Sequence, residues 1–289
     1  MLAFGAPGGA PDTIARTVAP KLTEAWGQQI LVDPRTGAGG TIATEIVAKA
    51  PPDGYTLLLA SPSHAINSSL YSKLPYDPVA DFAAVTHAAD VPNIVVIHPT
   101  VPARSIKQLI ALAKSKPGAL LYGSAGSGSS QHLAGELFQK MAGVKMVHVP
   151  YKGGGAVVVD LMSGQLQLTF GSTTSLPAIR SGRLIALAVT TARRVAALPE
   201  LPTVAEAGLL GYEAVVWYAV FAPARTPRSI VEKVSAELAR AIRLADVRER
   251  IEPQLIQPVG SSPAELAALL GREMKKWDAI VKESGARAD

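Results

Sequence analysis

The chain has 289 residues, of which 48% are hydrophobic and 18% charged, a balance that supports two ordinary domains and argues against extended disorder. Its net charge of +5 comes without a dense run of lysine or arginine, and aromatic residues make up only 5%, so a nucleic-acid-binding surface is not expected. The chain contains no cysteine, which excludes disulfides, thiol nucleophiles and cysteine-bound zinc.

Neither a membrane span nor an export signal is visible in the sequence. No run of about 18 apolar residues is present, so we expect no direct membrane insertion. The first residues lack the basic and apolar pattern of a secretory signal peptide. We therefore expect either the mature chain of an exported protein or a protein that is never exported.

Strand and helix patterns alternate from the start of the chain. The spacing of Ile14, Val18 and Leu22 predicts a helix from Asp12 to Trp26, with Asp12 as its N-cap. A strand over 30–32 precedes a glycine turn at 37–40. Beyond that turn the pattern predicts a helix over 41–49, strands over 55–60 and 93–98, and a helix over 105–116 capped by Ser105.

The same alternation continues to the C-terminus. We predict strands at residues 120–123, 147–149, 166–170, 184–190 and 217–222. Helices are predicted at residues 131–142, 156–163, 228–245, 247–255 and 263–284. This order predicts an α/β fold in which mainly parallel sheets carry helices on both faces.

Two apolar strands, over 94–97 and 217–222, are each followed by a pair of nearby prolines. We interpret them as crossover strands that connect two domains. Residues 1–100 and 222–289 would then form domain 1, and residues 101–221 an inserted domain 2. Two such connections would make a natural hinge.

Two glycine-rich loops stand at the transition from a strand to a helix. One lies within residues 122–136, which read YGSAGSGSSQHLAGE, and the other within residues 5–12, which read GAPGGAPD. Glycine lets the backbone approach a ligand, and the first turn of a helix offers unpaired N–H groups with a partial positive charge. Two such loops predict that one small anion, such as a carboxylate, is held from two sides.

An ordered set of short motifs resembles one known family. The motifs include APGG at 6–9 followed by Asp12, PRTGAGG at 34–40, and APPDGYTL at 50–57. They continue with LPYDP at 74–78, SAG through HLAGE at 124–136, HVPYKG at 148–153, and LP through PTVAEAG at 198–208. The chain therefore resembles the Bug family, the substrate-binding proteins of tripartite tricarboxylate transporters.

The resemblance implies a two-domain type II periplasmic binding-protein fold. It implies a periplasmic protein that captures a small carboxylate in an interdomain cleft by hinge closure and delivers it to membrane transporter subunits. We expect no cofactor, no metal and no nucleic acid, and we expect a monomer. In such proteins the two glycine loops face the ligand.

Carried over to this sequence, the family pattern implies sixteen ligand-binding residues, contributed by the glycine loops and by the ends of other strands: Phe4, Pro7, Gly8, Gly9, Ser61, Ser63, His64, Ala125, Gly126, Gly128, Ser129, Ser130, His132, Tyr151, Gly171 and Ser172. Many relatives have an acidic or amide residue where this chain has Gly171, so a contact with a ligand amino group is not expected there. The first strand is expected to be short, because few residues precede the first glycine loop.

Other chemistries fit less well. The glycine loops lack the lysine of a phosphate-binding P-loop, no serine has the flanking glycines of a nucleophile elbow, and no zinc motif is present. Two alternatives stay open: an enzyme, a hydrolase or isomerase of a small carboxylic acid that uses His132 and a nearby serine, and a cytosolic carboxylate sensor. His87, His98 and His148 are expected to be structural.

Overall fold

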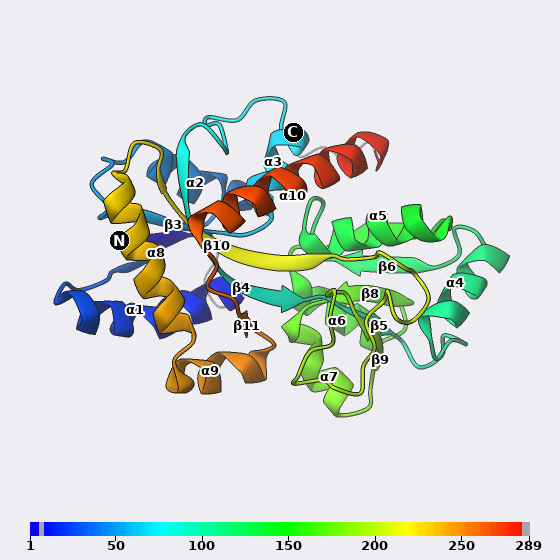
Figure 1. Ribbon diagram of the computed structural model, residues 1–289. Coiled ribbons are helices and arrows are strands. Elements are labelled where there is room, and N and C mark those ends of the chain that lie inside the picture. The colour runs from blue at the N-terminus through cyan, green and yellow to red at the C-terminus, as the bar shows by residue number, and fades with distance from the viewer. Residues whose placement is uncertain (6–8, 285–289) are drawn as a thin grey trace. The chain divides into compact units, whose positions relative to one another are not determined.

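The computed structural model describes residues 1–5 and 9–284, which fold into two compact units. Unit 1 consists of Met1–Val91 and Val216–Asp289, and unit 2 of Pro92–Val215. The chain thus passes from one unit to the other twice, after residue 91 and after residue 215. Each unit contains one sheet with helices packed on it (Figure 1).

Unit 1 is built on a six-stranded sheet with the order β11-β4-β10-β3-β1-β2. Its strands are β1 (Leu2–Phe4), β2 (Val32–Pro34), β3 (Leu57–Ala60), β4 (Phe82–Pro92), β10 (Val215–Pro223) and β11 (Gln257–Pro258). Strand β1 pairs in parallel with β2 and β3, whereas β10 runs antiparallel to β3 and β11 antiparallel to β4. The sheet is therefore mixed, and its parallel part is the β2-β1-β3 edge.

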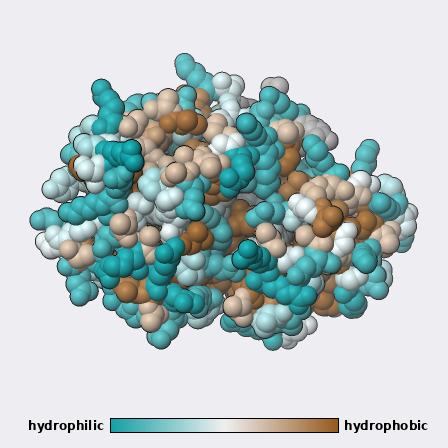
Figure 2. Space-filling view, viewed as in Figure 1, coloured by the Kyte–Doolittle hydropathy of each residue, from teal (hydrophilic) through white to brown (hydrophobic). Residues whose placement is uncertain are grey.

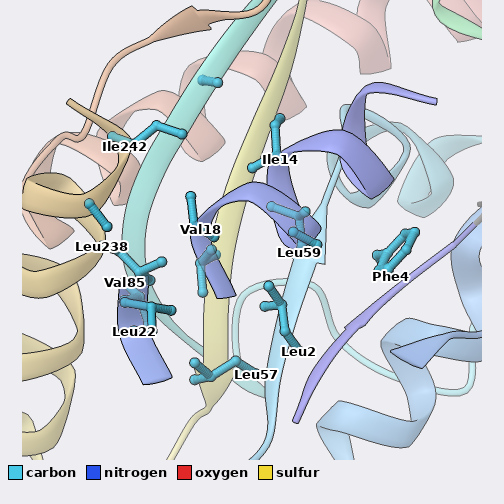
Figure 3. Packing of buried hydrophobic residues seen from close by; sticks show 14 of the residues in the cluster. Leu2, Phe4, Ile14, Val18, Leu22, Leu57, Leu59, Val85, Leu238 and Ile242 are labelled. Atoms are coloured by element: carbon cyan, nitrogen blue, oxygen red, sulfur yellow. The ribbon is translucent and has the colours of Figure 1, made fainter. Parts of the chain in front are cut away.

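Alternate residues of these strands face opposite sides of the sheet, and helices cover both sides. Leu57 and Leu59 pack with Ile14, Val18 and Leu22 in one buried cluster, which Figure 3 shows from close by. That cluster includes residues of α1 (Ala10–Trp26), α8 (Arg228–Ile242) and α9 (Ala245–Ile251). A second cluster contains Leu58 and residues of α2 (Thr41–Ala48), α3 (Ser63–Leu70) and α10 (Pro263–Ser284).

Unit 2 is built on a five-stranded sheet with the order β7-β6-β8-β5-β9. Its strands are β5 (Ile94–Ile97), β6 (Leu121–Ser124), β7 (Val147–Pro150), β8 (Leu168–Gly171) and β9 (Ile185–Val189). Strands β7, β6 and β8 are parallel, and β5 runs antiparallel to β8 and β9. The helices are α4 (Ile106–Ser115), α5 (Ser130–Ala142), α6 (Gly154–Met162) and α7 (Leu176–Arg180).

The fold class predicted from the sequence is confirmed, and most predicted elements are found within a few residues of their expected ends. Ser105 caps α4 as expected, because its side chain accepts from the N–H of Gln108 at 3.2 Å. The prediction for Asp12 was wrong: Gly9 is the N-cap of α1, and Asp12 lies inside the first turn. Three elements of unit 1 were missed, the long strand β4, helix α3 and the two-residue strand β11, and in unit 2 the short helix α7 was missed.

None of the helices within the described residues combines the length and the apolar character needed to cross a bilayer. On the face shown in Figure 2, hydrophilic and hydrophobic side chains are interspersed. The apolar residues that form the helix and strand patterns are instead buried against the two sheets.

Gly135 and Gly271 both lie within helices, but the first is crowded by neighbouring atoms and the second is not, so alanine is expected to change stability in opposite directions at the two positions. A Cβ added at Gly135 of α5 would lie 2.4 Å from Cε2 of the fully buried Tyr122, whereas nothing lies within 4 Å of one added at Gly271 of α10. We expect Gly135→Ala to destabilise by about 1–2 kcal/mol, because overpacking outweighs the gain in helix propensity. Gly271→Ala should stabilise by about 0.5–1 kcal/mol, since only the propensity changes. Denaturant unfolding measures both, and equal effects would contradict the packing argument.

Candidate functional site

Three loops of unit 2 meet beyond the carboxyl ends of the parallel strands β6, β7 and β8. They are residues 124–131, 151–154 and 171–174. A Cβ added at Gly154 would lie 3.1 Å from Oγ1 of Thr174, 3.5 Å from Nε2 of Gln131 and 3.7 Å from Oγ of Ser172. One point is therefore within reach of all three loops. We call these three loops the unit 2 loop cluster. They lie at the carboxyl edge of parallel strands, which is where open α/β sheets bind ligands.

The first of these loops is held by hydrogen bonds from its own amides. Gly126 and Gly128 have φ angles of +131° and +76°, which favour glycine. The N–H of Ala125 donates to Oε1 of Gln131 at 2.9 Å, that of Gly126 to Oγ of Ser124 at 3.2 Å, and that of Gly128 to Nδ1 of His132 at 3.1 Å. Ser129 caps α5 by accepting from the N–H of His132 at 3.3 Å. The expected anion donors Gly126 and Gly128 are thus occupied here.

Other donors of the same loop have no acceptor among the described residues. They are the backbone N–H groups of Ser127, Ser130 and Gln131 and the side-chain Nε2 of Gln131. Gln131 is 95% buried, since only 5% of its surface is exposed, and the start of α5 adds the partial positive charge of a helix N-terminus. Sequence reasoning missed Gln131 as a donor, although it stands between the predicted residues Ser130 and His132.

His132 lies behind the loop, with only 6% of its surface exposed. Its Nδ1 accepts from Gly128, and its Nε2 lies 3.7 Å from Oε1 of Glu136. Burial lowers the pKa of His132 to about 4, so the ring is neutral near pH 7. In this arrangement both ring nitrogens face protein groups, and direct contact of this ring with a ligand remains a prediction.

The remaining predicted residues of unit 2 lie in the other two loops. The Tyr151 hydroxyl donates to Oδ2 of Asp160 at 2.6 Å, and burial together with that carboxylate raises the pKa of Tyr151 to about 12. Gly171 ends β8, where a Cβ would lie 2.5 Å from Oγ of Ser175, so a side chain there would require the buried Ser175 to shift. Ser172 shares a hydrogen bond of 3.0 Å with Thr174, and these hydroxyls border the unit 2 loop cluster.

Unit 1 repeats the arrangement at the carboxyl ends of β1, β2 and β3. A Cβ added at Gly5 would lie 3.6 Å from Cα of Gly40, and one added at Gly40 would lie 3.6 Å from Oγ of Ser63. Oγ of Ser63 is in turn 2.9 Å from Oγ of Ser61. We call these four residues the unit 1 loop cluster; the predicted residue Gly9 is exposed and is the N-cap of α1. Pro7 and Gly8, which were also predicted, lie outside the described residues.

Two predicted residues of unit 1 lie in its core instead. Phe4 is fully buried, so only its backbone can face a ligand. His64 is 2% exposed, packs against Phe82 and Phe221, and its Nε2 lies 3.0 Å from the carbonyl oxygen of Pro78. Burial lowers the pKa of His64 to about 4. We expected His64 to contact a ligand because helix α3 was not predicted. Ser63 begins this helix, and the His64 ring is turned into the core.

The loops of the two clusters contain one charged residue, Lys152, whose side chain is exposed. Their other residues, at 4–9, 37–40, 61–63, 124–131, 151, 153–154 and 171–174, are glycine, serine, threonine and other neutral residues. No group of three histidine, aspartate or glutamate side chains among the described residues is placed to hold a metal ion. The chemistry available is hydrogen-bond donation by amides and hydroxyls, which suits an anion with several acceptor oxygens.

Comparison with known proteins places the chain among transport receptors. The model of the tripartite tricarboxylate transporter family receptor matches residues 14–286. Protein BugT of Bordetella pertussis is 37% identical over 284 residues, which cover 97% of this chain and 87% of BugT.

Two solved structures resemble this one over nearly the full length. A protein of R. palustris with adipate is 37% identical and matches with a TM-score of 0.86, covering 99% of this chain and 97% of that chain. MatC from Rhodopseudomonas palustris with bound malate is 31% identical, with a TM-score of 0.80 and 97% of each chain covered. Both of these proteins hold a dicarboxylate.

Proposed function

Because this chain belongs to the tripartite tricarboxylate transporter receptor family, we propose that it is a periplasmic receptor that captures a small dicarboxylate and delivers it to the membrane subunits of a transporter. The observation that carries the proposal is the set of N–H donors in the unit 2 loop cluster, at Ser127, Ser130 and Gln131, for which the described part of the chain supplies no acceptor. They offer one carboxylate several uncharged donors. Relatives that hold adipate and malate support this ligand class.

We further propose that the two units are the two domains of the receptor and that the unit 1 loop cluster contributes to the same ligand. Both clusters have the same construction, a glycine turn and serine hydroxyls beyond parallel strands. A dicarboxylate has two groups of acceptor oxygens, which suits two sets of neutral donors. Ligand binding would then favour a closed form through contacts that the open form lacks. The receptor is proposed to act as a monomer.

An enzymatic role is not part of the proposal. An enzyme of this kind would need an accessible serine beside a histidine. Among residues 1–5 and 9–284, the serine hydroxyl that contacts a histidine ring is that of Ser124, which lies 2.6 Å from Nε2 of His148 and is fully buried. Its hydroxyl also donates to the carbonyl of Gly126 at 3.0 Å, which is a structural use of that group.

Thermal unfolding with added dicarboxylates tests the ligand class. A ligand present at 100 times its Kd should stabilise the fold by about 2.7 kcal/mol, so adipate or malate in excess is expected to raise Tm by several degrees. Adipamide, which has the shape of adipate without its charges, is the matched control and should give no shift. If no di- or tricarboxylate shifts Tm at millimolar concentration, the proposed ligand class is wrong. Incubation with adipate should leave it chemically unchanged.

A further inference from the structure

Two histidine rings, from different elements of unit 2, stack behind the loop of residues 125–129. His132 comes from α5 and His148 from the edge strand β7, and their ring centroids are 3.9 Å apart with planes inclined by 19°. Tyr122 lies on β6, the strand beside β7, and its ring centroid is 5.0 Å from that of His148. The sequence predicted His132 as a ligand-binding residue and His148 as a structural residue.

Each ring holds the loop at a different point. Nδ1 of His132 accepts the N–H of Gly128 at 3.1 Å. Nε2 of His148 lies 2.6 Å from Oγ of Ser124, and that oxygen holds both the N–H and the carbonyl of Gly126. Both positive-φ glycines of the loop are therefore fixed, one directly and one through Ser124.

The hydrogen bonds determine where the ring protons must be. Gly128 can donate only to an unprotonated Nδ1, so the His132 proton is on Nε2, on the side of Glu136. Ser124 has one hydrogen, and its hydroxyl is placed to donate it to the carbonyl of Gly126, which also accepts from the N–H of Ser129 at 3.1 Å. All contacts of Ser124 are then satisfied if Nε2 of His148 donates to its oxygen. We therefore assign the Nε2–H tautomer to His132, and the same tautomer of His148 satisfies every contact of Ser124.

The surroundings favour the neutral rings. The pKa of each histidine is lowered to about 4, with burial as the largest cause; for His148 the neighbouring His132 also lowers the pKa, whereas Glu136 raises it. The titratable groups that face the pair are Glu136 on α5 and the hydroxyl of Tyr122 on β6, which donates to Glu136 at 2.5 Å. A proton on Nδ1 of His132 would remove the acceptor of Gly128.

We propose that His132 and His148 form a positioning pair that fixes the loop of residues 125–129, so that the unpaired amides of Ser127, Ser130 and Gln131 are presented together to the ligand carboxylate. This inference rests on the proposed function for its ligand, but the arrangement of the loop does not depend on any ligand. Neither ring needs to touch the bound molecule.

The first test reads the pair without ligand. In protein labelled with ¹⁵N on histidine, both rings are expected to be neutral at pH 6 with the proton on Nε2. A free histidine would be mostly protonated at that pH. An Nδ1–H tautomer of His132, or titration of both rings near their ordinary pKa, would overturn the proposal.

The second test compares two variants of His132. Asparagine offers an oxygen close to the position of Nδ1, whereas phenylalanine keeps a flat ring for stacking but has no acceptor. We expect the amide of Gly128 to exchange at least about tenfold faster in His132→Phe, and within about threefold of the original rate in His132→Asn. Equal exchange in both variants would overturn the role of the acceptor.

Adipate titrations of the same proteins connect the pair to binding. His132→Phe should weaken adipate binding by about tenfold or more, because it loses the hydrogen bond from the N–H of Gly128. His132→Asn keeps an acceptor for that N–H and should weaken binding by no more than about threefold. If both variants bind adipate as the parent does, the pair does not position the site. If the parent itself does not bind adipate, the proposed ligand is wrong, and hydrogen exchange alone decides the positioning role.

Discussion

Replacing Glu273 with leucine is expected to lower the free energy of unfolding by about 3–5 kcal/mol, because it leaves two buried donors without an acceptor. Glu273 lies on α10 and is 9% exposed. Its Oε2 accepts from Nε1 of Trp217 at 3.1 Å and from Nε1 of Trp277 at 2.7 Å. Both tryptophans are 2% exposed, so water cannot easily replace the lost carboxylate.

The geometry explains why one carboxylate matters to the whole of unit 1. Trp217 belongs to β10 and Trp277 to α10, so Glu273 ties the last helix to the sheet. Its other oxygen, Oε1, lies 3.3 Å from Nζ of Lys276, which also stands 4.6 Å from the centroid of the Trp277 ring. The indole groups orient the carboxylate, and the lysine balances its charge.

Glu273→Gln is the control for this prediction. The glutamine oxygen can still accept from both indoles, and only the pairing with Lys276 is lost, so a cost of about 1–1.5 kcal/mol is expected. Urea unfolding followed by tryptophan fluorescence measures both variants. A leucine variant as stable as the glutamine variant would mean that the indoles find other partners, and the assigned role of Glu273 would be refuted.

The sequence predicted the fold class because its strongest signals are local. The apolar spacing of Ile14, Val18 and Leu22 identified α1, and these residues are buried as expected. Glycine runs marked the turns at 37–40 and 125–128, where the structure has positive φ angles. Strand β4 was missed because its residues are mostly small and show no clear alternation, and α3 because its sequence SHAINSSL is polar. The antiparallel pairing of β3 with β10 joins strands that are far apart in the sequence, and no local pattern encodes it.

The site was predicted at the level of loops rather than atoms. Loops 125–130 and 171–174 do lie at the carboxyl ends of parallel strands. Which amides remain unpaired depends on the partners of each N–H, and those include Ser124, Gln131 and His132. Gly154 was not singled out either, because its importance comes from neighbours in two other loops. Such information exists only once the strands are placed side by side.

A larger side chain at Gly154 is expected to weaken ligand binding strongly while the fold survives. Gly154 begins α6 without a positive φ, so its backbone conformation accepts other residues. A Cβ there would already lie within 3.7 Å of Thr174, Gln131 and Ser172, and the methyl groups of valine would fill the space that these polar groups face. We expect Gly154→Val to weaken adipate binding by about 100-fold or more, which is about 2.7 kcal/mol.

Gly155 provides a closely matched control, because it is the next residue of the same helix turn and is exposed, with nothing within 4 Å of an added Cβ. Gly155→Val should bind adipate within about threefold of the parent, since it adds the same side chain away from the unit 2 loop cluster. Calorimetric titration gives both affinities, and the unfolding midpoints of the two variants should be close. If both valines weaken binding equally, the effect comes from the helix and not from the space beside Gln131. If neither does, the ligand does not occupy the unit 2 loop cluster, because a valine cannot share that space with a carboxylate.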